Sequence, residues 1–529
     1  MSSAAAGSML NAYLRQRELY DFVRKASGSH NMSSAQIGDA DAQAIAAALK
    51  VNTTLTEINL GGNQIGAAGA QAIAEALKAN RALKKLALGR NQIGDAGAEA
   101  IAEALKVNTT LTNIYLSKNH IGQVGAQAIA EALKKGSPRV SLSENQIGDA
   151  GALAIAAALK VNTTVTEVGL GMNQIDVAGA QAIAEALKVN ATLTNLFLGG
   201  NPFGDAGAQA VAEALSANTK LICLNLPQSQ IGEAGAHAIA SALEVNTTVM
   251  LLGLNENQIG DLGAQAIAAA LKVNTTVTEV GLGMNQIDVA GAQAIAEALK
   301  VNQIVISIGL DENQIGDAGA EAIAEAITVN KTVKKLGLGK NQIGDAGAQA
   351  IAVAFQVNQT VTALGLHQNR IGDVGAQAIA EALKVNKTVT ELGLYENQLG
   401  DAGAEAIAQA LKVNTTVAEL GLDGNQIGDV GAQAIVEALR VNKTVKMLYL
   451  EGNQIGDAKA LEIAMALKTN KTPADTHNSL SNPNFLTRAG TAASHAIGTL
   501  KDFIGGLYPQ RVPSPDESAN AAPAMEQLP

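Results

Sequence analysis

The strongest constraint on the fold is a period of 28 residues that runs through most of the chain. The pattern Leu-x-x-Leu-x-Leu-x-x-Asn recurs, and its Asn column extends from Asn63 to Asn453. All intervals in this column are 28 residues except the one between Asn119 and Asn145, which is 26. With an incomplete first unit that has Ala35 in this column, the chain contains sixteen units. Self-similarity at this period predicts a solenoid.

Each unit combines a strand pattern with a helix pattern. The apolar residues that alternate before the Asn predict a short strand with inward aliphatic side chains. The Asn amide can then satisfy backbone groups of the sharp turn that follows. Gly69 and its equivalents allow close backbone packing where the chain enters the next segment. Residues 70–78 predict a helix, because Ile73 and Leu77 are four residues apart and share one face.

A strand followed by a helix in every unit predicts one parallel sheet with right-handed crossovers. Helices are wider than strands, so we expect the helices on the convex face and the sheet on the concave face. Sixteen such units predict an α/β horseshoe in which each unit contacts only its neighbours.

The helix ends carry their own signals. An acid four residues after the Asn column, such as Asp95, is suited to cap the helix that begins there. Asn80 and Asn274, after the helices, are expected in the left-handed cap conformation. Glu75 and Lys78 are spaced for an ion pair on one helix face.

The repeat resembles the ribonuclease-inhibitor class of leucine-rich repeats, which also occurs in NOD-like receptors and in Ran GTPase-activating proteins. The resemblance covers residues 35–470. It implies the horseshoe fold, whereas function has to be argued from the site because one fold serves many functions.

Four regions follow from the pattern. We expect an N-terminal capping helix and a polar link in residues 1–34, with the amphipathic helix at 9–25, and the repeat array in residues 35–470. Residues 471–508 predict a loop and a capping helix, with a helix that binds a partner or a membrane surface as the alternative. Residues 509–529 are rich in Pro and Ala and predict a disordered tail.

The sequence offers little for catalysis. The glycines of Gly337-Leu338-Gly339-Lys340 lack the spacing of a phosphate-binding loop, and the six histidines are scattered without metal-ligand spacing. Cys223 is the single cysteine and has no histidine near it in the sequence. We therefore expect a protein that is not an enzyme and that has no cofactor and no metal site.

Charge and targeting signals indicate the setting. The net charge of −11 opposes binding to nucleic acid and mildly favours a basic protein partner. The N-terminus lacks the basic and apolar regions of a signal peptide, and no apolar run is long enough to span a membrane. We expect a cytoplasmic monomer, in which the recurring Asn-x-Thr sequons are a by-product of the repeat rather than glycosylation sites.

The candidate binding surface is the concave sheet face. Its central column contains glycine in eight of fifteen positions, so large anchors are few. Aromatic or long side chains lie near the two ends, and acids lie among the late ones. The predicted partner-binding residues are Tyr115, Arg139, Phe197, Asp311, Glu391, Tyr395, Glu419, Asp423, Met447, Tyr449 and Glu451. We expect a basic or flexible partner along this groove; the alternative is an array of homogenised repeats without a high-affinity ligand.

Two classes of function remain open. The first is an interaction scaffold that binds a protein. The second is a GTPase activator of the Ran type that acts on a small GTPase, or a regulatory or sensor repeat protein related to NOD-like receptors. Residues 472–529 contain only five acids, which weakens the resemblance to Ran activators with their strongly acidic segment. The lack of Trp and the single Cys argue against a ribonuclease inhibitor.

Overall fold

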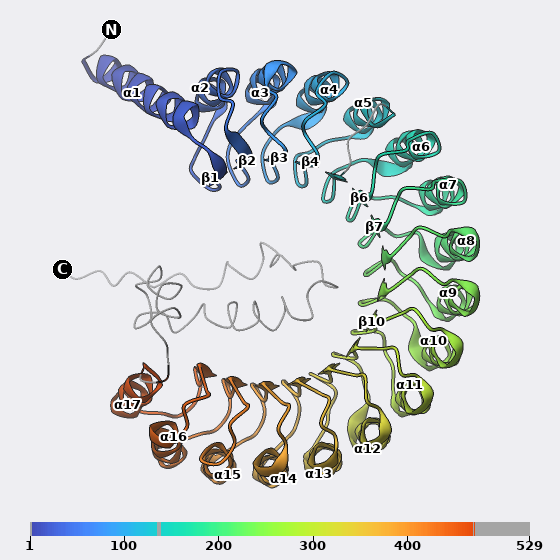
Figure 1. The fold of residues 1–529 in the computed structure, drawn as a ribbon, viewed down its shortest axis with the longest axis vertical. Helices are drawn as coiled ribbons and strands as arrows, with labels where there is room; N and C mark the ends of the chain where they lie inside the picture. Colours follow the sequence, from blue (N-terminus) through green and yellow to red (C-terminus); the bar gives the residue numbers. More distant parts are fainter. Residues whose placement is uncertain (1–2, 135–138, 469, 471–529) are drawn as a thin grey trace, which may run out of the picture.

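The computed structural model describes residues 3–134, 139–468 and 470 as an open horseshoe (Figure 1). In these residues, sixteen parallel strands form one sheet in strict sequence order, and seventeen helices accompany it. The sheet lines the inner face of the arc and the helices form the outer face (Figure 1). The horseshoe predicted from the repeat is therefore confirmed.

The strands after the first two contain three residues each and pair in register with the strands beside them. Their bounds are β1 Gly28–Asn31, β2 Leu55–Asn59, β3 Lys85–Ala87, β4 Asn113–Tyr115, β5 Arg139–Ser141, β6 Glu167–Gly169, β7 Asn195–Phe197, β8 Cys223–Asn225, β9 Leu251–Gly253, β10 Glu279–Gly281, β11 Ser307–Gly309, β12 Lys335–Gly337, β13 Ala363–Gly365, β14 Glu391–Gly393, β15 Glu419–Gly421 and β16 Met447–Tyr449.

The helices lie side by side in sequence order, each packed on the one before (Figure 1). Their bounds are α1 Ser3–Lys25, α2 Asp39–Leu49, α3 Ala67–Ala79, α4 Gly94–Leu105, α5 Gln123–Leu133, α6 Gly148–Leu159, α7 Val177–Leu187, α8 Gly204–Ala217, α9 Glu233–Val245, α10 Gly260–Val273, α11 Val289–Val301, α12 Gly316–Val329, α13 Asp345–Val357, α14 Asp373–Val385, α15 Asp401–Leu411, α16 Asp429–Val441 and α17 Asp457–Lys468.

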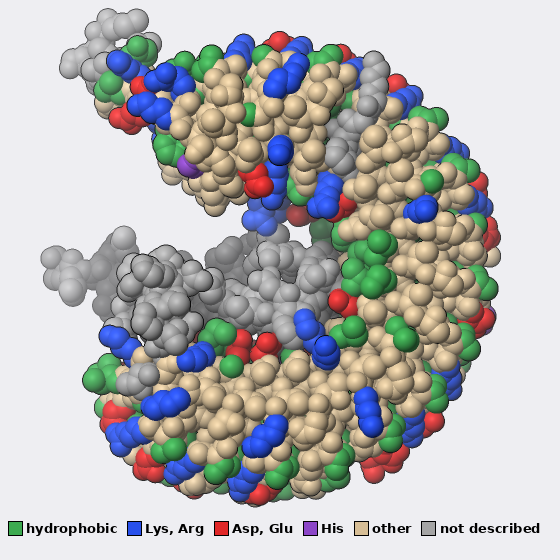
Figure 2. Space-filling view, in the orientation of Figure 1, with side chains coloured by type: hydrophobic (Ala, Val, Ile, Leu, Met, Phe, Trp, Pro, Cys, Tyr) green, Lys and Arg blue, Asp and Glu red, His purple; other side chains and the backbone are tan. Residues whose placement is uncertain are grey.

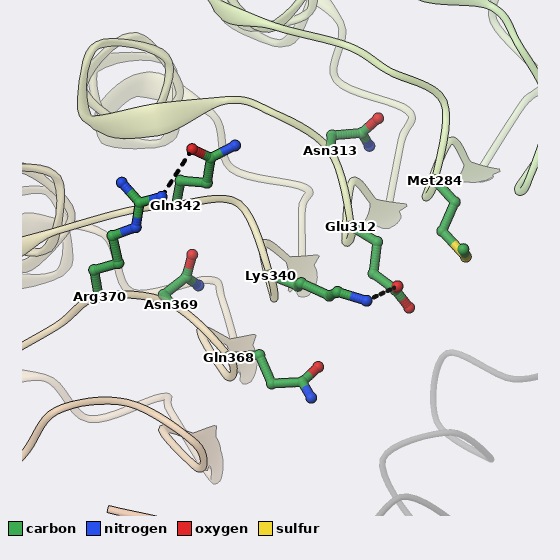
Figure 3. Close-up of a pocket in the computed structure, with 8 residues that line it drawn as sticks. All are labelled: Met284, Glu312, Asn313, Lys340, Gln342, Gln368, Asn369 and Arg370. Carbon is green, nitrogen blue, oxygen red and sulfur yellow. Dashed lines mark hydrogen bonds and ion pairs between the residues drawn. The ribbon is translucent and has the colours of Figure 1, made fainter. Parts of the chain in front are cut away.

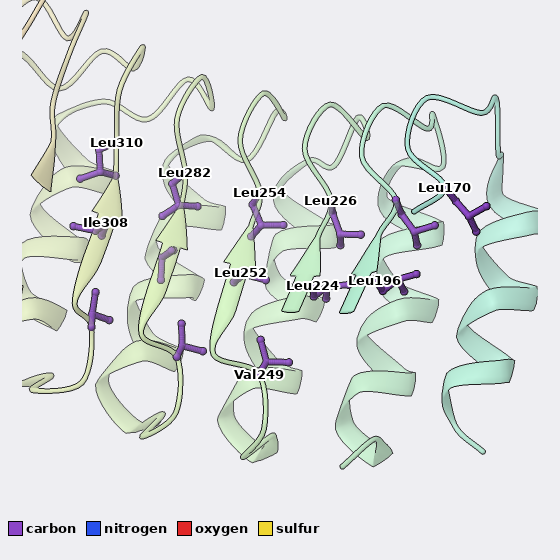
Figure 4. Packing of buried hydrophobic residues seen from close by; sticks show 14 of the residues in the cluster. Leu170, Leu196, Leu224, Leu226, Val249, Leu252, Leu254, Leu282, Ile308 and Leu310 are labelled. Atoms are coloured by element: carbon purple, nitrogen blue, oxygen red, sulfur yellow. The ribbon is translucent and has the colours of Figure 1, made fainter. Parts of the chain in front are cut away.

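The core is a set of aliphatic ladders that run along the arc between the sheet and the helices (Figure 4). Leu252 and Leu254 of one unit are fully buried and stack between their equivalents in the flanking units. Truncating such a leucine to alanine costs about 2–5 kcal/mol. The ladders explain how a chain with 2% aromatic residues builds a core.

Two columns of buried asparagine join the units. Asn91 donates hydrogen bonds to the carbonyl oxygens of Leu60 and Leu88 and accepts one from the Ile65 amide, as the turn position predicts. The second column follows the helices. Asn80 and Asn274 there are extended, with ψ of 133° and 134°, so the expected left-handed cap is wrong.

The asparagines of the second column bind backbone instead. Asn108 donates to the carbonyl oxygens of Leu77 and Asn80 and accepts from the amides of Thr110 and Leu111. It is 6% exposed, so its amide nitrogen is committed to the fold. Such an asparagine is unsuited to carry a glycan in the folded array, although it lies in an Asn-x-Thr sequon.

The capping acids serve the neighbouring helix, which corrects the sequence interpretation. Helix α4 has Ile93 as its N-cap residue and no side-chain cap. Its Asp95 instead accepts hydrogen bonds from the amides of Gly122 and Gly125 at the start of α5, at 2.7 and 2.9 Å. The carboxylate thus satisfies helix N–H groups one unit further along the chain.

Two smaller predictions about the helices are confirmed. A Cβ on Gly97 would lie 3.0 Å from the Cβ of Ala70, so the helices are packed too closely for a side chain there. Lys78 and Glu75 form an ion pair at 2.5 Å.

At the N-terminal end, α1 packs against α2 and Arg15 pairs with Asp41 at 2.9 Å. The segment expected as a polar link contains strand β1, which extends the sheet. Residues 135–138 of the shortened unit and the expected C-terminal cap and tail, 471–529, lie outside the described residues. No helix of the described part has the length and apolar character needed to cross a membrane.

Candidate functional site

The concave face has a floor of glycine that its own neighbouring side chains cover. Gly337, Gly365 and Gly421 end strands β12, β13 and β15, where a side chain would point out of the sheet. Side chains of the column two residues further along the chain lie over these glycines instead. Its late members are Asp311, Gly339, His367, Tyr395, Asp423 and Glu451.

Asp311 and His367 converge on the same part of this floor. A Cβ on Gly337 would lie 3.0 Å from the carboxylate carbon of Asp311, and one on Gly339 would lie 2.6 Å from His367 Nδ1. The Asp311 Oδ1 atom accepts a hydrogen bond of 2.7 Å from the Gly339 amide. The absence of a side chain at Gly337 and at Gly339 is therefore the reason that both groups can lie flat on the sheet.

Tyr395 extends the arrangement toward the C-terminal end. Its ring stacks on the His367 imidazole, with centroids 4.5 Å apart and an interplanar angle of 10°. On the other side, a Cβ on Gly421 would lie 3.3 Å from the Tyr395 ring and 3.9 Å from Asp423 Oδ2. We call Asp311, His367, Tyr395 and Asp423 the floor cluster.

Burial controls the ionisation of this cluster. It raises the pKa of Asp311 and of Asp423 to about 6, because neither carboxylate has a cationic partner among the described residues. Burial, with the positive charge of Lys340, lowers the pKa of His367 to about 4. At neutral pH the cluster therefore holds two ionised carboxylates and a neutral imidazole.

A hollow of about 520 Å³ adjoins the cluster on the loop side of the sheet (Figure 3). Glu312 and Gln368, which directly follow Asp311 and His367, contribute to its lining. Lys340 lies between them and pairs with Glu312 at 2.6 Å (Figure 3). Of the two cations in its lining, Lys340 is thus neutralised by Glu312, and Arg370 donates a hydrogen bond to Gln342 Oε1.

The early predicted anchors lie in a different setting. Lys85 lies 5.7 Å from the centre of the Tyr115 ring and 3.8 Å from Glu57, and Arg139 lies 3.9 Å from Glu167. Phe197, at the end of β7, is partly exposed. Figure 2 shows basic side chains beside acidic ones on the inner rim of this arm.

The remaining late residues are brought together at β14–β16. Glu391 and Glu419 pair in register on adjacent strands, and burial raises the pKa of both. The repulsion from Glu391 adds to the shift of Glu419. Met447 follows in register on β16, and its sulfur lies 3.5 Å from the Tyr449 hydroxyl oxygen. The exposed Glu451 donates its amide to Asp423 at 3.1 Å.

Sequence reasoning missed His367, because a lone histidine without a metal partner seemed incidental. The available signal was its position two residues after a glycine of the central column, between Asp311 and Tyr395 in the same column. A glycine floor leaves space for such a side chain. From the sequence alone, the glycine column indicates only that large anchors are few.

Two features of the described residues bear on metal and thiol chemistry. No group of three or more His, Cys, Asp or Glu side chains there is placed to hold a metal ion. Cys223 is buried, and burial raises the pKa of its thiol to about 11, so it is not an activated nucleophile.

The parallel sheet inside, the helices outside and the asparagine columns define a leucine-rich repeat protein. The description "Leucine Rich repeat" matches residues 51–74, 79–102 and 107–130. The description "NLRC3 LRR domain" matches residues 137–480, well over half of the chain. The chain belongs to this family of leucine-rich repeat domains, which confirms the resemblance to NOD-like receptor repeats.

Solved structures show more distant similarity. An internalin (inlF) from Listeria monocytogenes is 20% identical, with a TM-score of 0.43 over 69% of this chain and 86% of its own. The actin-binding site 2 of leiomodin-1 is 23% identical, with a TM-score of 0.26 over 36% of this chain and 93% of its own. A search of curated proteins gave no match.

Proposed function

We propose that this chain is a non-enzymatic scaffold that binds a protein partner on the concave face of its late units. Leucine-rich repeat domains in general mediate protein–protein interaction, and the proposal assigns that role to β11–β16. The observation that carries it is the pair of unneutralised carboxylates, Asp311 and Asp423, on the glycine floor. Uncompensated charge held on a concave surface favours a partner with basic side chains.

The aromatic residues of the same region would supply contact area. Tyr395 and Tyr449 lie among these acids, and tyrosine is enriched at the energetic centres of interfaces. Affinity capture with the chain and with the variant Tyr395→Ala/Tyr449→Ala tests this role. We expect loss of most of the partner from the variant, with Tyr13→Ala on the exposed part of α1 as control. Equal recovery by both variants contradicts the proposal.

A regulatory repeat protein related to NOD-like receptors is the favoured form of this scaffold. The match to an NLRC3 repeat domain over residues 137–480 supports it over a Ran-type GTPase activator, which has no supporting feature in the site. Measuring GTP hydrolysis by a Ran-type GTPase with the chain added separates the two. We expect no acceleration; a large acceleration would favour the activator.

We further propose that the chain works as a monomer in the cytoplasm. A single cysteine, Cys223, rules out an internal disulfide, which is the pattern of proteins from a reducing compartment. Sedimentation of the purified chain and fractionation of cells that contain it test these two points. A dimer in solution or the chain in a membrane or secreted fraction would contradict them.

A further inference from the structure

The part of the floor cluster between Asp311 and His367 has the features of a binding site rather than of packed core. A Cβ on Gly365 would lie 3.6 Å from His367 Nδ1 and 3.8 Å from Asp311 Oδ1. The two side chains thus approach one point above β13 from opposite sides. Gly337, Gly339 and Gly365 form a cradle around this point. A Cβ on Gly337 or Gly339 would overlap the cluster, and one on Gly365 would be in van der Waals contact with it.

Each side of this cradle has a polar atom without a hydrogen-bond partner in the described structure: Asp311 Oδ2 and His367 Nδ1. The two side chains are only 5% and 9% exposed. A buried polar atom that is left unpaired destabilises the isolated chain, and this cradle is bordered by two of them. Asp423 Oδ2 is unpartnered as well, but its side chain is only half-buried. The unpartnered oxygens of Asn119 and Asn285 differ, because both amides donate hydrogen bonds through Nδ2.

We infer that Asp311 and His367 form a recognition site for one cationic side chain of the partner, a lysine ammonium or an arginine guanidinium. This inference rests on the proposed function and gives it a specific contact. An ionised carboxylate only accepts hydrogen bonds, and a neutral imidazole accepts one at Nδ1 when Nε2 carries the proton. The complementary group must therefore donate at least two hydrogens and carry positive charge.

The chain's own cations leave this place open. Lys340 is the basic residue next to Gly339, and its Nζ lies 2.6 Å from Glu312 Oε2 in the neighbouring loop. It is thus engaged outside the cradle, at the hollow that adjoins the cluster. The Tyr395 ring backs His367 from the other side and fixes the plane of the imidazole.

A metal ion fits the site less well than an organic cation. Asp311 and His367 supply two ligand atoms, and the described residues contain no third His, Cys, Asp or Glu that completes a metal-binding group with them. Structural zinc takes four protein ligands. An ammonium or guanidinium group needs only the acceptors that are present.

Fluorescence anisotropy with labelled oligolysine and the whole chain tests the site. Asp311→Asn keeps the shape and the bond to the Gly339 amide but removes the charge and puts a donor in place of Oδ2. We expect it to weaken binding at least about tenfold, as for a truncated buried charge pair. Glu279→Gln on β10 is the matched control, because it removes the same charge from the same sheet face, and we expect less than about a twofold change. Equal weakening by both variants would overturn the inference, because attraction would then follow net charge alone.

Two further probes test the chemistry. Octamers of acetyl-lysine and of glutamate, which lack the cationic donor, should fail to compete with oligolysine. Oligoarginine and oligolysine in parallel titrations then show which cation the site prefers. Competition by acetyl-lysine at the concentration of oligolysine would contradict the need for a charged donor.

A spectroscopic signature separates this site from a merely structural role. In the chain labelled with ¹⁵N-histidine, we expect the His367 Nδ1 resonance to shift when oligolysine binds, because an acceptor nitrogen gains a donor. His367→Gln assigns this resonance among the six histidines. Binding of oligolysine without any shift of His367 places the cation elsewhere. If capture still depends on Tyr395 and Tyr449 in that case, the scaffold function stands and only the site is wrong.

Discussion

The two arms of the horseshoe build their concave faces by different rules. In the early arm, charges lie in pairs on adjacent units, such as Lys118 with Glu144 at 3.0 Å and Arg139 with Glu167. In the late arm, Asp311 is buried and Asp423 is half-buried on the glycine floor, and neither has an ion-pair partner among the described residues. The late arm also contains a pair of this kind, Lys340 with Glu312. The difference between the arms therefore lies in the column that contains Asp311 and Asp423, two residues after the strand-end glycines.

This contrast separates stability from recognition. Paired surface charges contribute about 0–1 kcal/mol each and have little left to offer a ligand. Buried carboxylates without a partner destabilise the isolated chain, and a ligand with the complementary charge recovers that free energy. The late arm thus has the features expected of a binding surface, and the early arm those of a solvated one.

The largest difference between the arms is expected when a floor glycine in each arm is replaced by alanine. We expect Gly339→Ala to lower the free energy of unfolding by about 1–3 kcal/mol and to abolish oligolysine binding, because its Cβ overlaps the His367 ring. Gly89→Ala occupies the same column in the early arm, where the Cβ would meet only the Ser117 carbonyl oxygen at 3.3 Å. Urea unfolding of both variants checks this; a similar loss in both would show that the arms are alike.

Neutralising one acid in each arm sharpens the comparison. We expect Asp311→Asn to raise the free energy of unfolding at pH 7 by about 1–3 kcal/mol, since it removes a buried charge. Glu167→Gln should change the free energy of unfolding by less than about 0.5 kcal/mol, because it loses only a partly exposed pairing with Arg139. Thermal and urea unfolding measure both. A less stable Asp311→Asn chain would mean that the carboxylate has a favourable role in the isolated fold.

The pH dependence of binding offers a third comparison. Asp311 and Asp423 have pKa values of about 6, so both are mostly ionised at pH 7 and mostly protonated at pH 5. Oligolysine affinity should fall about tenfold per required carboxylate over this range. His367, with a pKa of about 4, stays neutral throughout. The charged groups that face the cluster from neighbouring loops are Lys340, Glu312 and Glu396. Affinity that is level from pH 7 to pH 5 would contradict the assignment.

The same pKa values fix the sign of the stability change. A carboxyl whose pKa is raised by folding stabilises the folded state when protonated, and this contribution is lost as the pH rises through the folded value. The unliganded chain should therefore become less stable from about pH 5 to pH 7. In Asp311→Asn this slope should be shallower. A steeper dependence of the free energy of unfolding on pH in the variant would show that other titratable groups control the pH dependence.

Replacing a capping acid should have the smallest effect on stability, and the effect should be the same in both arms. Asp95 and Asp373 each accept two amide hydrogen bonds from the next helix, at 2.7 to 2.9 Å. Replacing either with alanine should lower the free energy of unfolding by about 1 kcal/mol. Equilibrium unfolding of the two variants compares them. Clearly different losses would show that the scaffold itself varies between the arms.

The sequence predicted what a single unit determines. Leu252 and Ile73 are buried where the strand and helix periods place them, because side-chain direction depends on local geometry. The prediction that Asp95 caps its own helix was wrong. Its carboxylate binds an amide of the next unit, and the sequence pattern of a single unit carries no information on contacts between units. The left-handed conformation predicted for Asn80 was wrong for a related reason. Its side-chain amide binds the preceding unit, and this bond favours an extended backbone.

The floor cluster was predicted only in part. Asp311, Tyr395 and Asp423 were identified as concave residues from their column. Their burial depends on glycines in adjacent units, which provide the space for His367 to lie flat and for Tyr395 to stack on it. Contacts between columns of different units require the stacked geometry, and so the cluster became apparent only in three dimensions.

Bonds that connect one unit to the next also affect how such a gene can lengthen. Asn108 and its equivalents bind the preceding unit, whereas the Asp95 bond to the next unit has no equivalent at Ala67 or Val177, which carry no carboxylate. A stretch that is a whole number of periods long can therefore be duplicated with its asparagine bonds kept at the new junction. Residues 161–190 and 273–302 are identical, as such an event would leave them. The asparagine column thus gives the chain a structural tolerance for recombination between misaligned copies.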